Sequence, residues 1–157
     1  MPVVSSENRK YIPMGLIKDK CIYTNATNYI DYATIYDFGI LTSNVHMSWM
    51  RVFAGRLKSD YRYSKNLVYN TFPWPNPTES QREEIEKTAQ KILVIRDKYP
   101  ESSLSDLYDE LIMPSDLRKA HQDNDKAVMA AYGFDWRKMS ESECVGELMK
   151  LYKELIH

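Results

Sequence analysis

The sequence is poor in the residues that build disulfide-stabilised, secreted or membrane proteins. It has two cysteines among 157 residues, Cys21 and Cys144, which lie far apart and belong to no metal-ligand spacing. A disulfide between them is possible but has no support, and two lone thiols fit a reducing cytoplasm better than a secreted scaffold. No signal peptide and no long apolar run is present. We therefore expect a cytoplasmic protein with no membrane partner.

The sequence also lacks the motifs of a self-sufficient enzyme. It contains no glycine-rich phosphate or cofactor loop, no P-loop and no Cys/His cluster, and its three histidines, His46, His121 and His157, are scattered. We therefore expect no catalytic, cofactor-binding or metal site in this chain.

Charge is distributed unevenly, although the formal net charge is only −1. Residues 51–65 carry five basic side chains against a single acid, Asp60, whereas residues 79–110 carry nine acidic and five basic side chains. Local distribution matters more than the sum. One face of the protein is thus suited to a polyanion.

Composition changes near Asn76 and predicts two parts. Residues 1–76 are rich in Tyr, Thr, Ile and Asn in short segments, and residues 77–157 show long helical periods. Three prolines within residues 73–77 exclude a regular helix or central strand there and predict a stiff extended connector. The predicted fold class is α+β and mainly helical, with a small α/β part followed by an antiparallel helical subdomain.

The first part is expected to alternate short strands and helices. The patterns predict strands over 11–17 and 21–24 joined by a charged turn at 18–20, a helix over 29–36, and strand-like runs over 57–63 and 66–72. Asn28 is expected to cap the first helix and Gly39 to end it. Ser43 or Asn44 is expected to cap a second helix that Gly55 closes.

The second part is expected to hold three longer helices and one short one. Thr78 or Ser80 begins a helix that runs to about Lys98, and Ser103 begins the short helix, which extends through Leu111. Pro114 suits the first turn of the next helix, which ends at Gly133. Ser140–Glu143 is a capping-box pattern for the last helix, in which Leu148 lies on the apolar stripe.

The strongest candidate site is the run Gly55–Lys65, GRLKSDYRYSK. Arginine and lysine neutralise phosphates, arginine also bonds guanine edges, and tyrosine and serine hydroxyls add phosphate bonds. As one strand, the run places Arg56 and Arg62 on a shared face about 20 Å apart. The alternative is a solvated edge strand whose charges discourage aggregation. The candidate DNA-binding residues are Arg51, Arg56, Lys58, Tyr61, Arg62, Tyr63, Ser64 and Lys65.

Two other groups of residues favour a structural interpretation. The aromatic cluster is expected to be mostly core, with base stacking as a minority possibility; its members are Trp49, Phe53, Tyr61, Tyr63, Tyr69, Phe72 and Trp74. Asn124 lies on the apolar face of its helix, one turn after His121. We expect them to form a satisfied buried polar pair or an interface hydrogen bond.

Several segments resemble one known family. Several segments look like the end of a target-recognition domain: FGILTS (38–43), HM (46–47) with Trp49, GRLKSDYRYS (55–64) and NTFPWP (70–75). The downstream runs SLSDLY (103–108), LRKAHQ (117–122) and NDKAVM (124–129) are similar to a C-terminal helical domain. The similarity is to MmeI-like (type IIL) restriction-modification enzymes and related class I adenine-N6 DNA methyltransferases, and it covers nearly the whole chain after about Ser5.

This resemblance implies a longer parent polypeptide. It would hold a methyltransferase domain that uses S-adenosylmethionine, preceded in MmeI-like members by a nuclease domain and a helical spacer, and it would bind double-stranded DNA. Asn76-Pro77-Thr78 lacks the second proline and the aromatic residue of the base-holding motif in adenine methyltransferases. The family's catalytic residues therefore have no positions here, and only DNA contact carries over, at Arg56–Lys65.

Three interpretations remain open from the sequence. The chain is a non-catalytic recognition fragment of a methyltransferase or fused restriction enzyme, a free-standing specificity or regulatory protein, or a helical protein-interaction module. A longer reading frame upstream of Met1 would support the first, and failure to bind DNA at low salt would favour the third.

Overall fold

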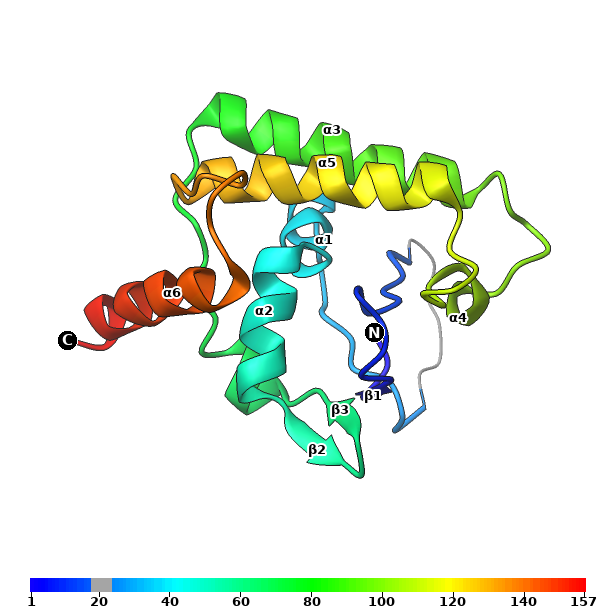
Figure 1. Cartoon of the computed structure of the whole chain (residues 1–157), viewed down its shortest axis with the longest axis horizontal. Coiled ribbons are helices and arrows are strands. Elements are labelled where there is room, and N and C mark those ends of the chain that lie inside the picture. The colour runs from blue at the N-terminus through cyan, green and yellow to red at the C-terminus, as the bar shows by residue number, and fades with distance from the viewer. Residues whose placement is uncertain (18–23) are drawn as a thin grey trace.

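The computed structural model describes residues 1–17 and 24–157. Two long helices, α3 (Glu79–Arg96) and α5 (Ser115–Ala131), pack side by side and form the upper layer in Figure 1. Below them, α1 (Ile35–Leu41) packs against α3, and α2 (Asn44–Phe53) runs from α5 toward a small sheet. The last helix, α6 (Glu141–Ile156), packs on α2 and extends away from the body.

The sheet has three short antiparallel strands in the order β1-β3-β2. Strand β1 (Val4–Ser5) pairs with β3 (Asp60–Arg62), and β3 pairs with β2 (Gly55–Leu57) across a turn at Lys58 and Ser59. Helices dominate the rest of the described chain. The prediction of an α+β, mainly helical fold is therefore confirmed.

Four predicted helix starts are confirmed by their side-chain caps. Ser43 accepts from the backbone of His46, and Thr78 and Ser140 form complete capping boxes with Gln81 and Glu143. Such caps satisfy backbone N–H groups that have no partner within the helix. Ser103 caps α4 (Leu104–Leu107), but this helix ends one turn before the predicted Leu111 because Tyr108 leaves the helical conformation.

Other predictions for the first part are wrong. The helix predicted over 29–36 begins at Ile35, because Thr34 and Asp37 form a capping box there. Asn28 instead pairs through its backbone with Met1. Residues 11–17 form no strand, and the run 66–72 begins with a π-helix, η1 (Lys65–Tyr69), capped by Ser64. The predicted turn at 18–20 and residues 21–23 lie outside the described residues.

Gly39 does not end α1 but lies inside it, where α3 passes very close. A Cβ atom at Gly39 would lie 2.8 Å from Ile85 Cγ2 and 3.1 Å from the Ala89 Cβ. Its carbonyl also accepts a hydrogen bond of 2.8 Å from Asn124 Nδ2 on α5. The missing side chain thus allows α1, α3 and α5 to approach one another.

We expect Gly39→Ala to destabilise the protein by about 1–3 kcal/mol, although this substitution usually stabilises a helix interior. The reason is the contact with Ile85, which is fully buried and has little room to move. Urea unfolding of the wild type and variant measures the difference. Gly146→Ala in α6 is the control, because a Cβ there meets nothing within 4 Å. A gain in stability at Gly39 would contradict the close packing.

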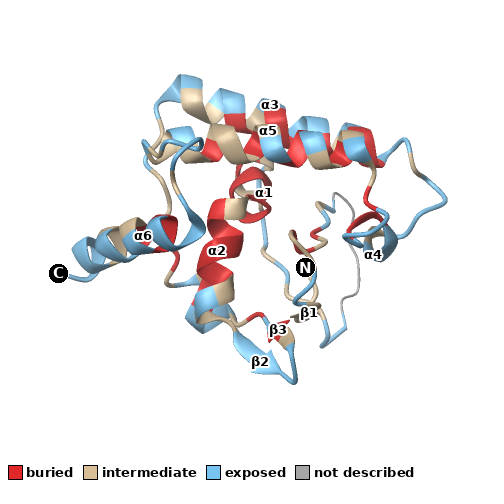
Figure 2. Cartoon of the chain, viewed as in Figure 1, coloured by how far each residue is buried: buried red, intermediate tan, exposed pale blue. Residues whose placement is uncertain are grey.

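One hydrophobic core joins both parts of the sequence. The inner faces of the long helices and most of α2 are buried, whereas β2 and the outer half of α6 are exposed (Figure 2). Trp49, Tyr61, Tyr63 and Phe72 are all buried, so the interpretation of the aromatic cluster as mostly core is confirmed. Leu148 is fully buried, as its spacing predicts. Among the described residues, no helix is long and apolar enough to cross a membrane.

Candidate nucleic-acid interface

The basic segment is a hairpin, and the single strand predicted over 57–63 is wrong. Strands β2 and β3 meet at Lys58 and Ser59, with Arg56 opposite Tyr61 and Gly55 opposite Arg62. Directly opposed residues share a face of the sheet, and neighbours along a strand alternate. Arg56 therefore lies on the face of Tyr61 and Arg62 on the other, so the two arginines do not share a face.

Arg56 stabilises the hairpin by contacts within it. Its guanidinium lies 3.9 Å from the centroid of the Tyr61 ring, and its Nη1 donates a hydrogen bond of 2.8 Å to the Ser59 carbonyl. The same nitrogen lies 3.5 Å from a carboxylate oxygen of Glu7. Much of the bonding capacity of Arg56 is thus used within the protein, although its side chain remains half-exposed.

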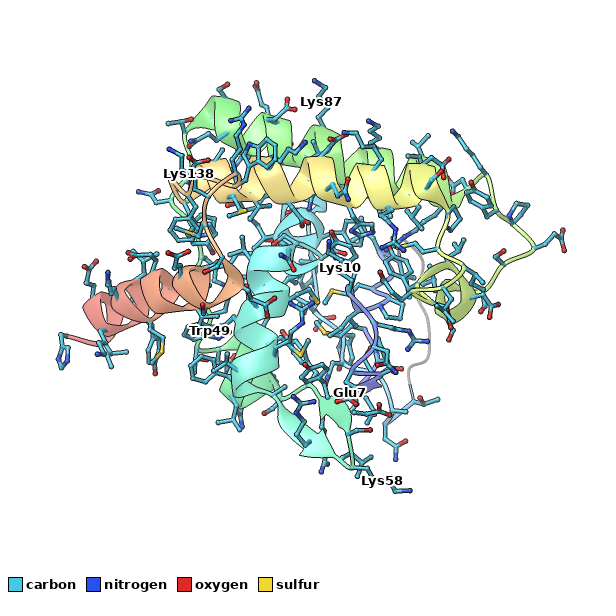
Figure 3. All side chains as sticks on the ribbon, viewed as in Figure 1. Glu7, Lys10, Trp49, Lys58, Lys87 and Lys138 are labelled. Carbon is cyan, nitrogen blue, oxygen red and sulfur yellow. The ribbon has the colours of Figure 1, made fainter. Side chains whose placement is uncertain are left out.

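Three cations of the segment face solvent. Lys58, Arg62 and Lys65 are exposed, and none makes a side-chain hydrogen bond or ion pair with another described residue. Lys58 occupies the tip of the hairpin with φ of 57° and points away from the body (Figure 3). A lysine in this left-handed region costs energy that glycine would avoid. These cations are available to an external anion.

The two tyrosines of the candidate set are buried. The Tyr63 hydroxyl lies 2.9 Å from Nε2 of His46. Burial raises the pKa of Tyr63 and lowers the pKa of His46 to about 3, so both are neutral at pH 7. The ring of Tyr61 lies beneath Arg56. These side chains hold the hairpin on the core, and their contact with DNA stays a prediction.

The remaining candidates also make contacts within the fold. Ser64 accepts a hydrogen bond from the Leu67 backbone and caps η1. Arg51 is mostly buried and forms an ion pair of 3.1 Å with Glu141 of α6. The sequence shows the charge of Arg51 but not this partner, which lies 90 positions further on. Of the eight candidates, Arg56, Lys58, Arg62 and Lys65 thus keep exposed side chains, on both faces of the hairpin and at the start of η1.

Buried polar residues of α5 were found only partly by the sequence reasoning. Asn124 is satisfied by Gly39 and by Thr88, whose hydroxyl donates 3.0 Å to Asn124 Oδ1. Nε2 of His121 lies 2.6 Å from the Tyr108 hydroxyl. Each is buried and bonded across an interface, but they do not bond to each other. Asp125, one residue further on, was missed because no pattern distinguishes it from a surface acid.

The described residues hold no group of three His, Cys, Asp or Glu side chains suited to a metal ion. Cys144 is a buried free thiol, and Cys21 lies outside the described residues. Burial raises the pKa of the Cys144 thiol, which makes it a poor nucleophile.

A two-stranded basic hairpin, held at the end of a buried helix by a helical scaffold, is typical of a nucleic-acid-binding module. The chain belongs to the MmeI family: residues 1–76 match the family model "MmeI, target recognition domain", and residues 77–157 match "MmeI, C-terminal domain".

Two relatives agree with this assignment. DNA methyltransferase A of Bacillus subtilis (strain 168) is 44% identical over 155 residues, which are 99% of this chain and 17% of that protein. A solved structure described as the type IIL restriction-modification enzyme MmeI in complex with DNA is 47% identical, with a TM-score of 0.93, and the match covers 99% of this chain and 21% of that one. The resemblance found in the motifs is confirmed, and the chain spans about a fifth of these relatives' length.

Proposed function

We propose that this chain is the DNA-binding C-terminal part of an S-adenosylmethionine-dependent adenine-N6 DNA methyltransferase of a restriction-modification system. Residues 1–76 end its target-recognition domain, and residues 77–157 form its C-terminal helical domain. The observation that carries the proposal is the exposed basic hairpin on a backbone closely similar to an enzyme solved with DNA. Methyl transfer and cofactor binding belong to the methyltransferase domain of the parent polypeptide, which acts in the cytoplasm.

The hairpin has the shape and charge for duplex DNA. A two-stranded β-ribbon fits the major groove, which is about 12 Å wide. Arg62 at the end of β3 and Lys65 at the start of η1 are both exposed and can neutralise phosphates. Lys58 at the tip of the hairpin points away from the body (Figure 3), and its ammonium group can donate to guanine O6 or N7. Arg56 supports the ribbon through Tyr61 and Ser59.

We expect the 157-residue chain to bind duplex DNA weakly and with strong salt dependence. A part of a recognition cleft makes few phosphate contacts, so Kd should be on the order of 10⁻⁴ to 10⁻⁶ M. Arg62→Ala should weaken binding to all sequences and reduce the salt slope by about 1, the value for one lost phosphate contact. Fluorescence titration of labelled duplex at several salt concentrations measures both quantities.

The control is Lys87→Ala, which removes an exposed cation on α3 at the opposite end of the molecule from Lys58 (Figure 3). It should leave affinity and salt slope unchanged. Arg56→Ala should lower the melting temperature more than Arg62→Ala, because it removes the contacts of Arg56 with the Tyr61 ring and the Ser59 carbonyl. Equal affinity of the wild type and Arg62→Ala would contradict the assignment. Absence of binding at low salt would favour the helical protein-interaction module instead.

A further inference from the structure

Helix α2 connects the helical scaffold to the basic hairpin. Its first residue, Asn44, lies against α5, and its last turn leads through Ala54 directly into β2 at Gly55. A helix is a stiff element, so a displacement at its first turn is transmitted to its last. The contacts that fix α2 therefore also fix the direction of the hairpin.

One end of α2 is held by a carboxylate from α5. Oδ1 of Asp125 accepts a hydrogen bond of 2.7 Å from the backbone N–H of Asn44, and Oδ2 accepts one of 2.6 Å from the Tyr11 hydroxyl. The Asn44 amide is among those a helix cannot satisfy internally, and a negative charge is favourable at a helix N-terminus. Asp125 thus joins three segments that are distant in sequence.

The groups around Asp125 determine how much of its side chain is ionised at pH 7. Burial raises its pKa to about 6, while the bonds from Tyr11 and Asn44 and the charges of Lys10 and Arg51 lower it. At pH 7 the carboxylate form therefore predominates. A half-buried charge with two hydrogen bonds of fixed direction defines one geometry more strictly than an apolar contact does.

The other end of α2 is held by Lys10, next to Tyr11, and by the start of α6. Arg51 donates a hydrogen bond of 2.9 Å to the Lys10 carbonyl and pairs with Glu141 at the start of α6. Lys10 and Tyr11 are consecutive, so one short segment contacts Arg51 and Asp125 together. Both fixed points of α2 thus depend on residues of the helical part, α5 and α6.

We propose that Asp125 is a positioning residue for DNA recognition, which sets α2 and through it the hairpin by bonding Asn44 and Tyr11. This inference rests on the proposed function. It assigns the C-terminal helical domain a role beyond support, since one of its side chains determines where the basic hairpin meets DNA. Asp125 itself touches no DNA.

Asp123 provides a matched control on the same helix. It lies two residues away and forms ion pairs of 3.3 Å with Lys91 on α3 and of 3.8 Å with Lys126, and it also pairs with Lys119. Asp123→Ala removes an acid and its ion pairs without touching α2. A difference between Asp125→Ala and Asp123→Ala therefore reports on the contact with α2 and not on lost charge in general.

The experiment uses the isotopically labelled 157-residue chain. Residual dipolar couplings of backbone amides in α3, α5 and residues 55–62 give the orientation of the hairpin relative to the scaffold, and duplex titrations give affinity and salt slope. For Asp125→Ala we expect hairpin couplings that no longer fit the wild-type orientation and about five- to tenfold weaker binding. The salt slope should be unchanged, because the cations remain present. Asp123→Ala should keep the wild-type hairpin couplings, affinity and salt slope.

Two milder variants keep the test decisive if Asp125→Ala does not fold. Asp125→Asn retains an acceptor for the Asn44 amide, and Tyr11→Phe removes only the hydroxyl contact. Both should shift the hairpin in the same direction by a smaller amount. A lower melting temperature with wild-type couplings and wild-type affinity would overturn the proposal. If the wild type binds no DNA, the proposed function fails, while the couplings still decide whether Asp125 sets the hairpin.

Discussion

Replacing Leu148 with alanine is expected to lower the free energy of unfolding by about 2–5 kcal/mol. Leu148 is fully buried on the face of α6 that packs against α2, together with Cys144 and Val145. The substitution removes apolar contacts and leaves a cavity that the surrounding helices fill only in part. Urea unfolding of the 157-residue chain, followed by circular dichroism, measures the change.

Met149→Ala is the control for this prediction. Met149 is adjacent in sequence but 38% exposed, so its truncation should cost much less than that of Leu148. A loss under about 0.5 kcal/mol for Leu148→Ala would mean that α6 contributes nothing to the core. The helical part would then fold without its last helix.

The sequence predicted the features that depend on local chemistry. Ser43, Thr78 and Ser140 cap helices because a side-chain oxygen reaches a backbone N–H three residues away. The apolar stripe that buries Leu148 follows from helical spacing alone. These features depend only on residues that are close in sequence, so they could be predicted without knowing the rest of the fold.

Features that depend on distant neighbours were missed. Gly39 resembles a helix stop in the sequence. Glycine is needed there because Ile85, 46 positions away on another helix, leaves no room for a side chain. The hairpin was predicted as one strand because residues 57–63 alternate and its turn contains no glycine or asparagine, the usual signal. Lys58 adopts the left-handed conformation without that signal.

The candidate DNA-binding site stays a prediction, and the structure shows how far local charge describes its residues. Local charge identified the segment, and Lys58, Arg62 and Lys65 are exposed there. Charge alone does not show that Arg51 pairs with Glu141 or that the Tyr63 hydroxyl meets His46, because those partners lie on other elements. The role proposed for Asp125 depends in the same way on Tyr11 and Asn44.

Trp49→Ala is expected to have the largest effect, a loss of about 3–5 kcal/mol. Trp49 has no exposed surface, and its ring centroid lies 4.1 Å from that of Phe53 and 6.0 Å from that of Tyr152 on α6. Its Nε1 also lies 3.4 Å from Thr71 Oγ1, which joins α2 to the chain after η1.

Trp49→Phe should cost less than Trp49→Ala, because phenylalanine keeps an aromatic ring between α2 and α6 and loses only the nitrogen and part of the volume. Since Leu148 lies at the same α2–α6 contact, the double variant with Leu148→Ala should deviate from additivity by about 0.5–3 kcal/mol. Full additivity in urea unfolding would show that the two side chains stabilise separate parts of the core. The deviation expected here would instead show that α2, which carries the hairpin, is stabilised cooperatively by the last helix.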